Sequence, residues 1–62
     1  MAQANQDECR LAFCQRSLAR LEAARGNGAI AEQWAISARQ QFERLGMLTE
    51  ARETEDLLQT LT

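Results

Sequence analysis

The side chains able to do chemistry in this 62-residue chain are few: two cysteines, seven arginines, nine acidic residues and no histidine or tyrosine. Without an imidazole, a catalytic triad, an imidazole general base and a histidine-containing metal site are all excluded. Cys9 and Cys14 cannot complete a zinc shell, although two chains together would supply four thiolates. The acidic residues near the carboxyl end lack the spacing of a calcium loop. We therefore expect no enzyme activity, no cofactor and no metal.

The two cysteines are expected in different environments. On a helix, five positions correspond to about 140° of rotation, so Cys9 and Cys14 diverge and cannot join within one chain. Cys14 falls on an apolar stripe and is expected to be buried and inert, whereas Cys9 should be partly exposed and more reactive. Free thiols favour the cytoplasm, and the amino terminus has no signal-peptide pattern. No apolar run approaches the ~20 residues that span a membrane.

Phe13, Arg16 and Arg20 are the candidate partner-binding residues, because steps of three and four place them on one side of a helix. The two arginines repel each other unless an anion lies between them. Beside an exposed aromatic ring they would suit a carboxylate or an acidic peptide. The alternative is that both arginines are solvated and that Phe13 packs on a helix expected near the carboxyl end, at about 49–61.

Composition and length limit the class of protein. A hydrophobic content of 45% argues against disorder, and a net charge of −2 makes nucleic acid an unexpected partner. In a chain this short, the free energy of burial about balances the loss of conformational entropy. We therefore expect a protein or peptide partner or a longer helical array, and homo-oligomerisation stays open. No membrane association is expected.

The hydrophobic periodicity predicts an all-α fold, with a flexible terminus over residues 1–5 and one domain over residues 6–62. The first helix is expected at about 6–25 and the second, antiparallel to it, at about 29–45, with Gly26-Asn27-Gly28 between them. Gly46 is expected to end the second helix, and a third should span about 49–61. The alternative is one continuous helix through Gly46, at a cost of ~1 kcal/mol.

The second helix is expected to lie between the other two, because it alternates small and aromatic residues along one face. In the first helix, two stripes could pack: a leucine-rich seam and a neighbouring stripe of alanines. The expected packing positions are Leu11, Cys14, Leu18, Ala19, Leu21, Ala31, Trp34, Ala38, Phe42, Leu45, Ala51, Leu58 and Leu61.

Part of this pattern resembles the tetratricopeptide repeat, in the longer form common in bacterial multi-repeat regulators. The resemblance rests on the small residues of the first helix, the Gly-Asn turn, Ala31, Ala38 and the run Phe42-Glu43-Arg44-Leu45-Gly46 followed by Glu50-Ala51. Leu18 and Ala19 match the family's Leu-Gly pair where its two helices touch. The segment 46–61 is similar to the first helix of a following repeat, serving as a cap.

The resemblance implies a scaffold or adaptor that binds a protein or peptide, with Phe13, Arg16 and Arg20 on the inner, ligand-facing surface. The chain departs from the family at Glu22, where an aromatic is usual, and at Gln15, near the usual tryptophan. A single repeat also leaves one of its faces uncovered, since such proteins normally stack about three.

Two other interpretations are open. A helical hairpin of this size can dimerise into a four-helix bundle with an RNA-binding or regulatory role. The chain is also faintly similar to the small co-chaperones of type III secretion needles, through Arg25-Gly26 and Glu32-Gln33-Trp34.

Overall fold

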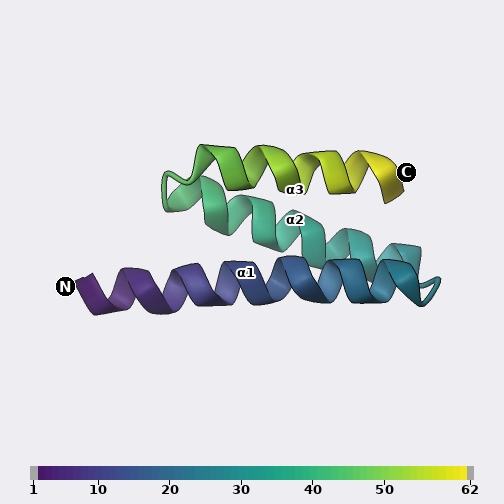
Figure 1. Ribbon diagram of the computed structural model, residues 1–62, viewed down its shortest axis with the longest axis horizontal. Coiled ribbons are helices and arrows are strands. Elements are labelled where there is room, and N and C mark those ends of the chain that lie inside the picture. Colours follow the sequence, from purple (N-terminus) through teal and green to yellow (C-terminus); the bar gives the residue numbers. More distant parts are fainter. Residues whose placement is uncertain (1, 62) are drawn as a thin grey trace.

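The computed structural model describes the backbone of residues 2–61 and the side chains of residues 7–61, and it is all-helical over that range. The helices are α1 (Ala2–Ala24), α2 (Gly28–Arg44) and α3 (Leu48–Leu61), shown in Figure 1. The predicted all-α class is confirmed, as are the bounds of the second and third helices to within one residue. The first helix begins earlier than expected, because the Ala- and Gln-rich start contains no helix-breaking residue. Met1 lies outside the described residues, and the flexibility of residues 1–5 stays a prediction.

Both turns are built by a glycine in the left-handed region. Gly26 has φ +87° and Gly46 has φ +76°, a conformation that a residue with a Cβ adopts only with strain. In the first turn the Asn27 amide donates to the Glu22 carbonyl at 2.8 Å, and in the second the Met47 amide donates to the Phe42 carbonyl at 2.8 Å. The predicted break at Gly46 is therefore confirmed, and a continuous second and third helix is wrong.

The first turn also gives Glu22 a structural role. The Glu22 carboxylate accepts a hydrogen bond of 2.7 Å from the Asn27 side-chain amide. A polar residue at this position therefore holds the turn, as a carboxylate can and an aromatic ring cannot.

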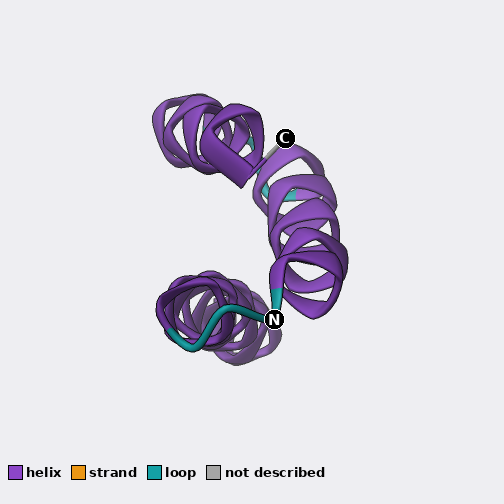
Figure 2. Ribbon diagram, turned by 90° about the vertical axis from the view of Figure 1, so that its right-hand side faces the viewer, coloured by secondary structure: helices purple, strands orange, loops and turns teal. Residues whose placement is uncertain are grey.

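The helix α2 lies between α1 and α3, as expected. Both outer helices pack along α2 and hardly touch each other. Seen end-on, the three helices follow an arc with α2 in its middle and α1 at one end (Figure 2). One side of α1 therefore faces α2, and much of the remainder has no helix against it.

The buried core is made mostly of alanines around one aromatic ring. Ala12 of α1, Ala38 and Phe42 of α2 and Ala51 of α3 form a single cluster, with Met47 packed against it. Further along the same contacts, Ala19, Ala31 and Ala35 are also fully buried. Because alanine adds so little width, helix axes can approach closely along such stripes.

The leucine seam of α1 was expected to be buried, but the alanine stripe packs against α2 instead. Leu11 is 47% exposed, Leu21 is 51% exposed, and Cys14 is exposed, so the prediction that these three are buried is wrong. The alanine stripe turns inward instead, because the facing side of α2 is itself lined with alanines and the close approach leaves no room for leucine.

The other predicted packing positions divide into two groups. Those confirmed as buried are Ala19, Ala31, Ala38, Phe42 and Ala51. Those found half-buried at the edges of the helix contacts are Leu18, Trp34, Leu45, Leu58 and Leu61.

Candidate functional site

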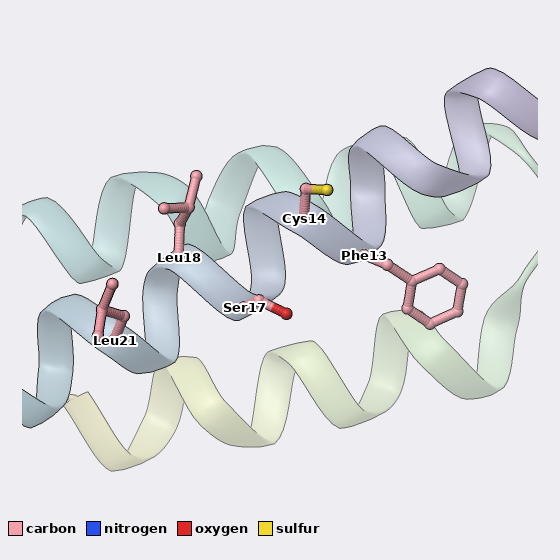
Figure 3. A pocket seen from close by; sticks show the side chains of 5 residues that line it. All are labelled: Phe13, Cys14, Ser17, Leu18 and Leu21. Carbon is pink, nitrogen blue, oxygen red and sulfur yellow. The ribbon is translucent and has the colours of Figure 1, made fainter.

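Exposed apolar side chains are concentrated on α1. Of the six large hydrophobic side chains that are exposed in the described part of the chain, three lie on this helix: Leu11, Phe13 and Leu21. An open hollow of about 470 Å³ runs along α1 and is lined by Phe13, Cys14, Ser17, Leu18 and Leu21. In Figure 3, Cys14, Leu18 and Leu21 project from one side of α1, and Phe13 points away from them.

We call Leu11, Cys14, Leu18 and Leu21 the outer face of α1. Their steps of three, four and three residues are the spacing at which one helix packs its seam against another in a coiled coil. The same stripe continues by four residues in each direction, to Asp7 at one end and Arg25 at the other, and both are exposed. The outer face is therefore an apolar strip with an acidic end and a basic end.

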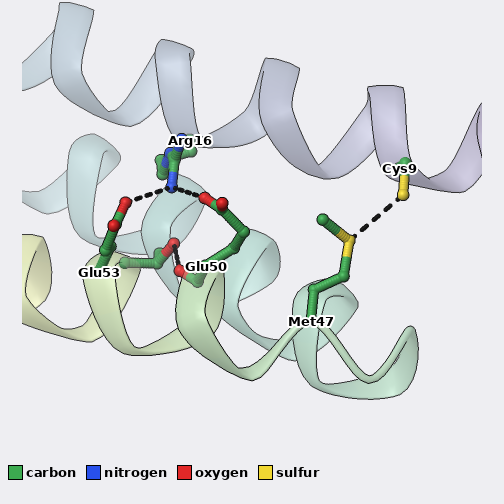
Figure 4. A network of polar contacts seen from close by, with 6 residues as sticks. Cys9, Arg16, Met47, Glu50 and Glu53 are labelled. Carbon is green, nitrogen blue, oxygen red and sulfur yellow. Dashed lines mark hydrogen bonds and ion pairs between the residues drawn. The ribbon is translucent and has the colours of Figure 1, made fainter.

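Arg16 lies on a different side of α1 and is engaged within the chain. Its Nη1 donates to Glu50 Oε1 of α3 at 2.7 Å and reaches Glu53 Oε1 at 3.4 Å (Figure 4). The guanidinium also lies over two rings, 5.2 Å from the centroid of Phe13 and 5.5 Å from that of Phe42. We call these five residues the arginine clasp, because they join α1 to α3 across the concave side of the arc.

The clasp changes the environment of the three predicted binding residues. The Phe13 ring meets the Phe42 ring edge-on, with centroids 5.1 Å apart and planes at 74°, so its aromatic partner is on α2 and not on α3. Arg16 is neither solvated nor open to a ligand, since its side chain is only 14% exposed. Arg20 is exposed and has no ion pair with any residue that the structure describes. The three therefore do not form one open patch.

The spacing of Arg16 and Arg20 suggested an anionic ligand between the two, whereas the structure places the Glu50 carboxylate of α3 against Arg16 alone. Glu50 lies 34 positions away, and no local spacing links the two. The one available signal was that the acidic residues of the third helix include a pair, Glu50 and Glu53, on consecutive turns.

The other reactive groups of the chain offer no catalytic arrangement. Cys9 is half-buried, and its Sγ donates to Met47 Sδ at 3.2 Å, so this thiol packs against the second turn (Figure 4). Within the described residues, no group of three or more His, Cys, Asp or Glu side chains is placed to hold a metal ion. None of the described helices combines the length and apolar character needed to cross a membrane.

Replacing Arg16 with methionine should lower the free energy of unfolding by about 1–3 kcal/mol, because methionine keeps the contact with the two rings but leaves the Glu50 carboxylate without its cation. Urea denaturation followed by circular dichroism measures the change. Glu53→Gln is the matched control: its contact is longer and its side chain 55% exposed, so it should cost under about 0.5 kcal/mol. An equal decrease in the free energy of unfolding of the two variants would show that the close Arg16–Glu50 pair contributes no more to stability than the Arg16–Glu53 contact.

Comparisons of the chain with protein-family models, with curated proteins and with solved structures find no match. Its function is therefore inferred from the outer face of α1 and from the arginine clasp.

Proposed function

We propose that this chain is a non-catalytic protein-interaction module, similar in architecture to a tetratricopeptide repeat, that binds a helix of a protein partner through the outer face of α1. The single observation that carries the proposal is the outer face itself: leucines at coiled-coil spacing, with Leu11 and Leu21 exposed and Leu18 half-buried, on a helix that buries Ala12 and Ala19 instead. The arc of helices around α2 supports the likeness to a repeat scaffold or adaptor.

Leaving leucines in water is unfavourable, which is why the outer face favours a partner. Covering a leucine side chain fully contributes about 1.5–3 kcal/mol, and Leu11 and Leu21 are each about half uncovered. In a chain of 62 residues a single core provides only a small free energy of unfolding. A partner that covers this strip would therefore stabilise the fold as well as bind to it.

A helix fits the outer face better than an acidic peptide fits the predicted patch of Phe13, Arg16 and Arg20. Apolar side chains at steps of three and four match the anchors of a bound helix. In the clasp, Glu50 and Glu53 already neutralise Arg16, so an acidic ligand would find Arg20 as the one exposed cation of the predicted patch. The net charge of −2 likewise disfavours RNA. The two free cysteines favour a cytoplasmic role.

The test is capture of partners from an extract of cells that express the chain. The bait is the wild-type chain or the variant Leu11→Glu/Leu21→Glu, whose substitutions are both on exposed positions. We expect the double variant to lose at least about 90% of the captured partner, since each buried carboxylate would cost over 1.4 kcal/mol, about tenfold in affinity. Circular dichroism checks that the variant keeps its helices.

Leu48→Glu is the matched control, because Leu48 is 70% exposed but lies at the start of α3, away from the outer face. This control should capture as much partner as the wild type. Unchanged capture by the double variant would overturn the proposal. If Arg20→Glu abolished capture instead, the partner would bind the concave surface that the family resemblance implies.

A further inference from the structure

We infer that the helix covering the outer face is α1 of a second copy of this chain, lying antiparallel, so that the protein forms a two-fold symmetric dimer. This inference rests on the proposed function, because it names the partner of the same surface. Three properties of α1 carry it: the pairing of its apolar residues, the charges at the two ends of the strip, and the position of the other helices.

The apolar residues of the outer face pair with one another under a two-fold axis at the level of residue 16. In that register Leu11 lies opposite Leu21 of the second copy, and Cys14 lies opposite Leu18. Each pairing occurs twice, so all four apolar positions of both copies meet an apolar residue. Such self-complementarity is what a two-fold interface requires, since the same patch must fit itself.

The charged ends select the antiparallel direction. In the same register Asp7 lies opposite Arg25 of the second copy, an attractive pair that also occurs twice. A parallel pairing would place Asp7 against Asp7 and Arg25 against Arg25, both repulsive. Among the side chains that the structure describes, Arg25 has an ion pair only with Glu22, at a distance of 3.9 Å, and its side chain is 64% exposed, so it can also reach a second copy.

The rest of the fold leaves room for this dimer. Ala12 and Ala19, the buried alanines of α1, lie about 120–140° from the centre of the outer face on the helix circumference. The clasp residue Arg16 lies on a third side, toward α3. A second copy can therefore approach α1 without meeting α2 or α3 of the first, and the two copies of α1 and α2 would together form a four-helix arrangement.

The mass of the wild-type chain in solution is the first test. Sedimentation equilibrium from about 1 µM to about 1 mM should show a monomer–dimer equilibrium, and the melting temperature should rise with concentration. Leu11→Glu/Leu21→Glu should be monomeric throughout, whereas Leu48→Glu should dimerise like the wild type. A wild-type monomer at the highest concentration would overturn the dimer. The proposed function would still stand in that case if the double variant lost a captured partner that Leu48→Glu retained.

The register is tested by charge reversal. Asp7→Arg or Arg25→Asp alone should weaken dimerisation about tenfold, because two attractive pairs become repulsive. The double variant Asp7→Arg/Arg25→Asp should recover most of the wild-type affinity. If the double variant lost as much dimerisation free energy as the two single variants added together, the proposed pairing of residues 7 and 25 would be wrong.

Disulfide trapping tests the direction independently. In a chain with Cys9→Ser and Cys14→Ser, the pair Leu11→Cys/Leu21→Cys should give a covalent dimer on oxidation, and Leu11→Cys alone should give none. Efficient cross-linking of the single variant would indicate a parallel pairing and would overturn the antiparallel dimer.

Discussion

Replacing Phe42 with alanine should unfold most of the protein at room temperature. Phe42 is the one large apolar side chain in the described region that is fully buried. It shares one buried cluster with alanines of all three helices and also lies against the Phe13 ring and the Arg16 guanidinium. Truncating a buried phenylalanine costs about 3–5 kcal/mol. That loss matches or exceeds the stability of about 3–5 kcal/mol that a single core provides in a chain below 70–80 residues.

The measurement is helical circular dichroism at low temperature, followed by urea titration. Phe42→Ala should show a large loss of helix signal without urea, and any remaining transition should be broad. Ile36→Ala is the control on the same helix, because Ile36 is 37% exposed and its truncation should cost under about 1 kcal/mol. A Phe42→Ala variant with the urea midpoint of the control would show that the alanine contacts, and not this ring, supply most of the stability.

The two turns between the helices could be predicted from the sequence because they depend on local chemistry. Gly26 and Gly46 take left-handed conformations that only glycine adopts without strain, and each follows a long helical pattern. The central place of α2 could also be predicted, because its small and aromatic residues alternate along one face. These features require no knowledge of which residues meet across the fold.

The clasp could not be predicted because it is a long-range contact. Arg16 and Glu50 are 34 positions apart, and their distance of 2.7 Å depends on how α1 and α3 are both placed by α2. From the sequence, Arg16 and Arg20 therefore look alike, although one is engaged in an ion pair and the other is exposed. The third candidate, Phe13, has a long-range partner too, because its ring meets the Phe42 ring of α2 edge-on at a centroid distance of 5.1 Å.

The choice of the buried face of α1 depends on the neighbouring helix. Both stripes of α1 have helical spacing. If burial of apolar area alone decided the packing, the leucine stripe would face α2. The facing side of α2, however, is lined by Ala31, Ala35 and Ala38, all fully buried. Two alanine stripes let the helices approach closely, and this packing leaves Leu11 and Leu21 of the outer face exposed.

This explanation predicts that enlarging a buried alanine costs more stability than truncating an exposed leucine. Hydrophobicity alone would predict the reverse. Enlarging Ala12 to leucine should destabilise the chain by about 1–3 kcal/mol, because Ala12 is fully buried between the helices and the added methyl groups would force α1 from α2. Truncating its neighbour, by Leu11→Ala, should lower the free energy of unfolding of the monomer by under about 1 kcal/mol, because the Leu11 side chain is 47% exposed. Urea denaturation at about 1 µM, where the proposed dimer is dissociated, compares the two. If Leu11→Ala proved the more damaging variant, the leucine stripe would be the true packing face and the outer face would not be free to bind a partner.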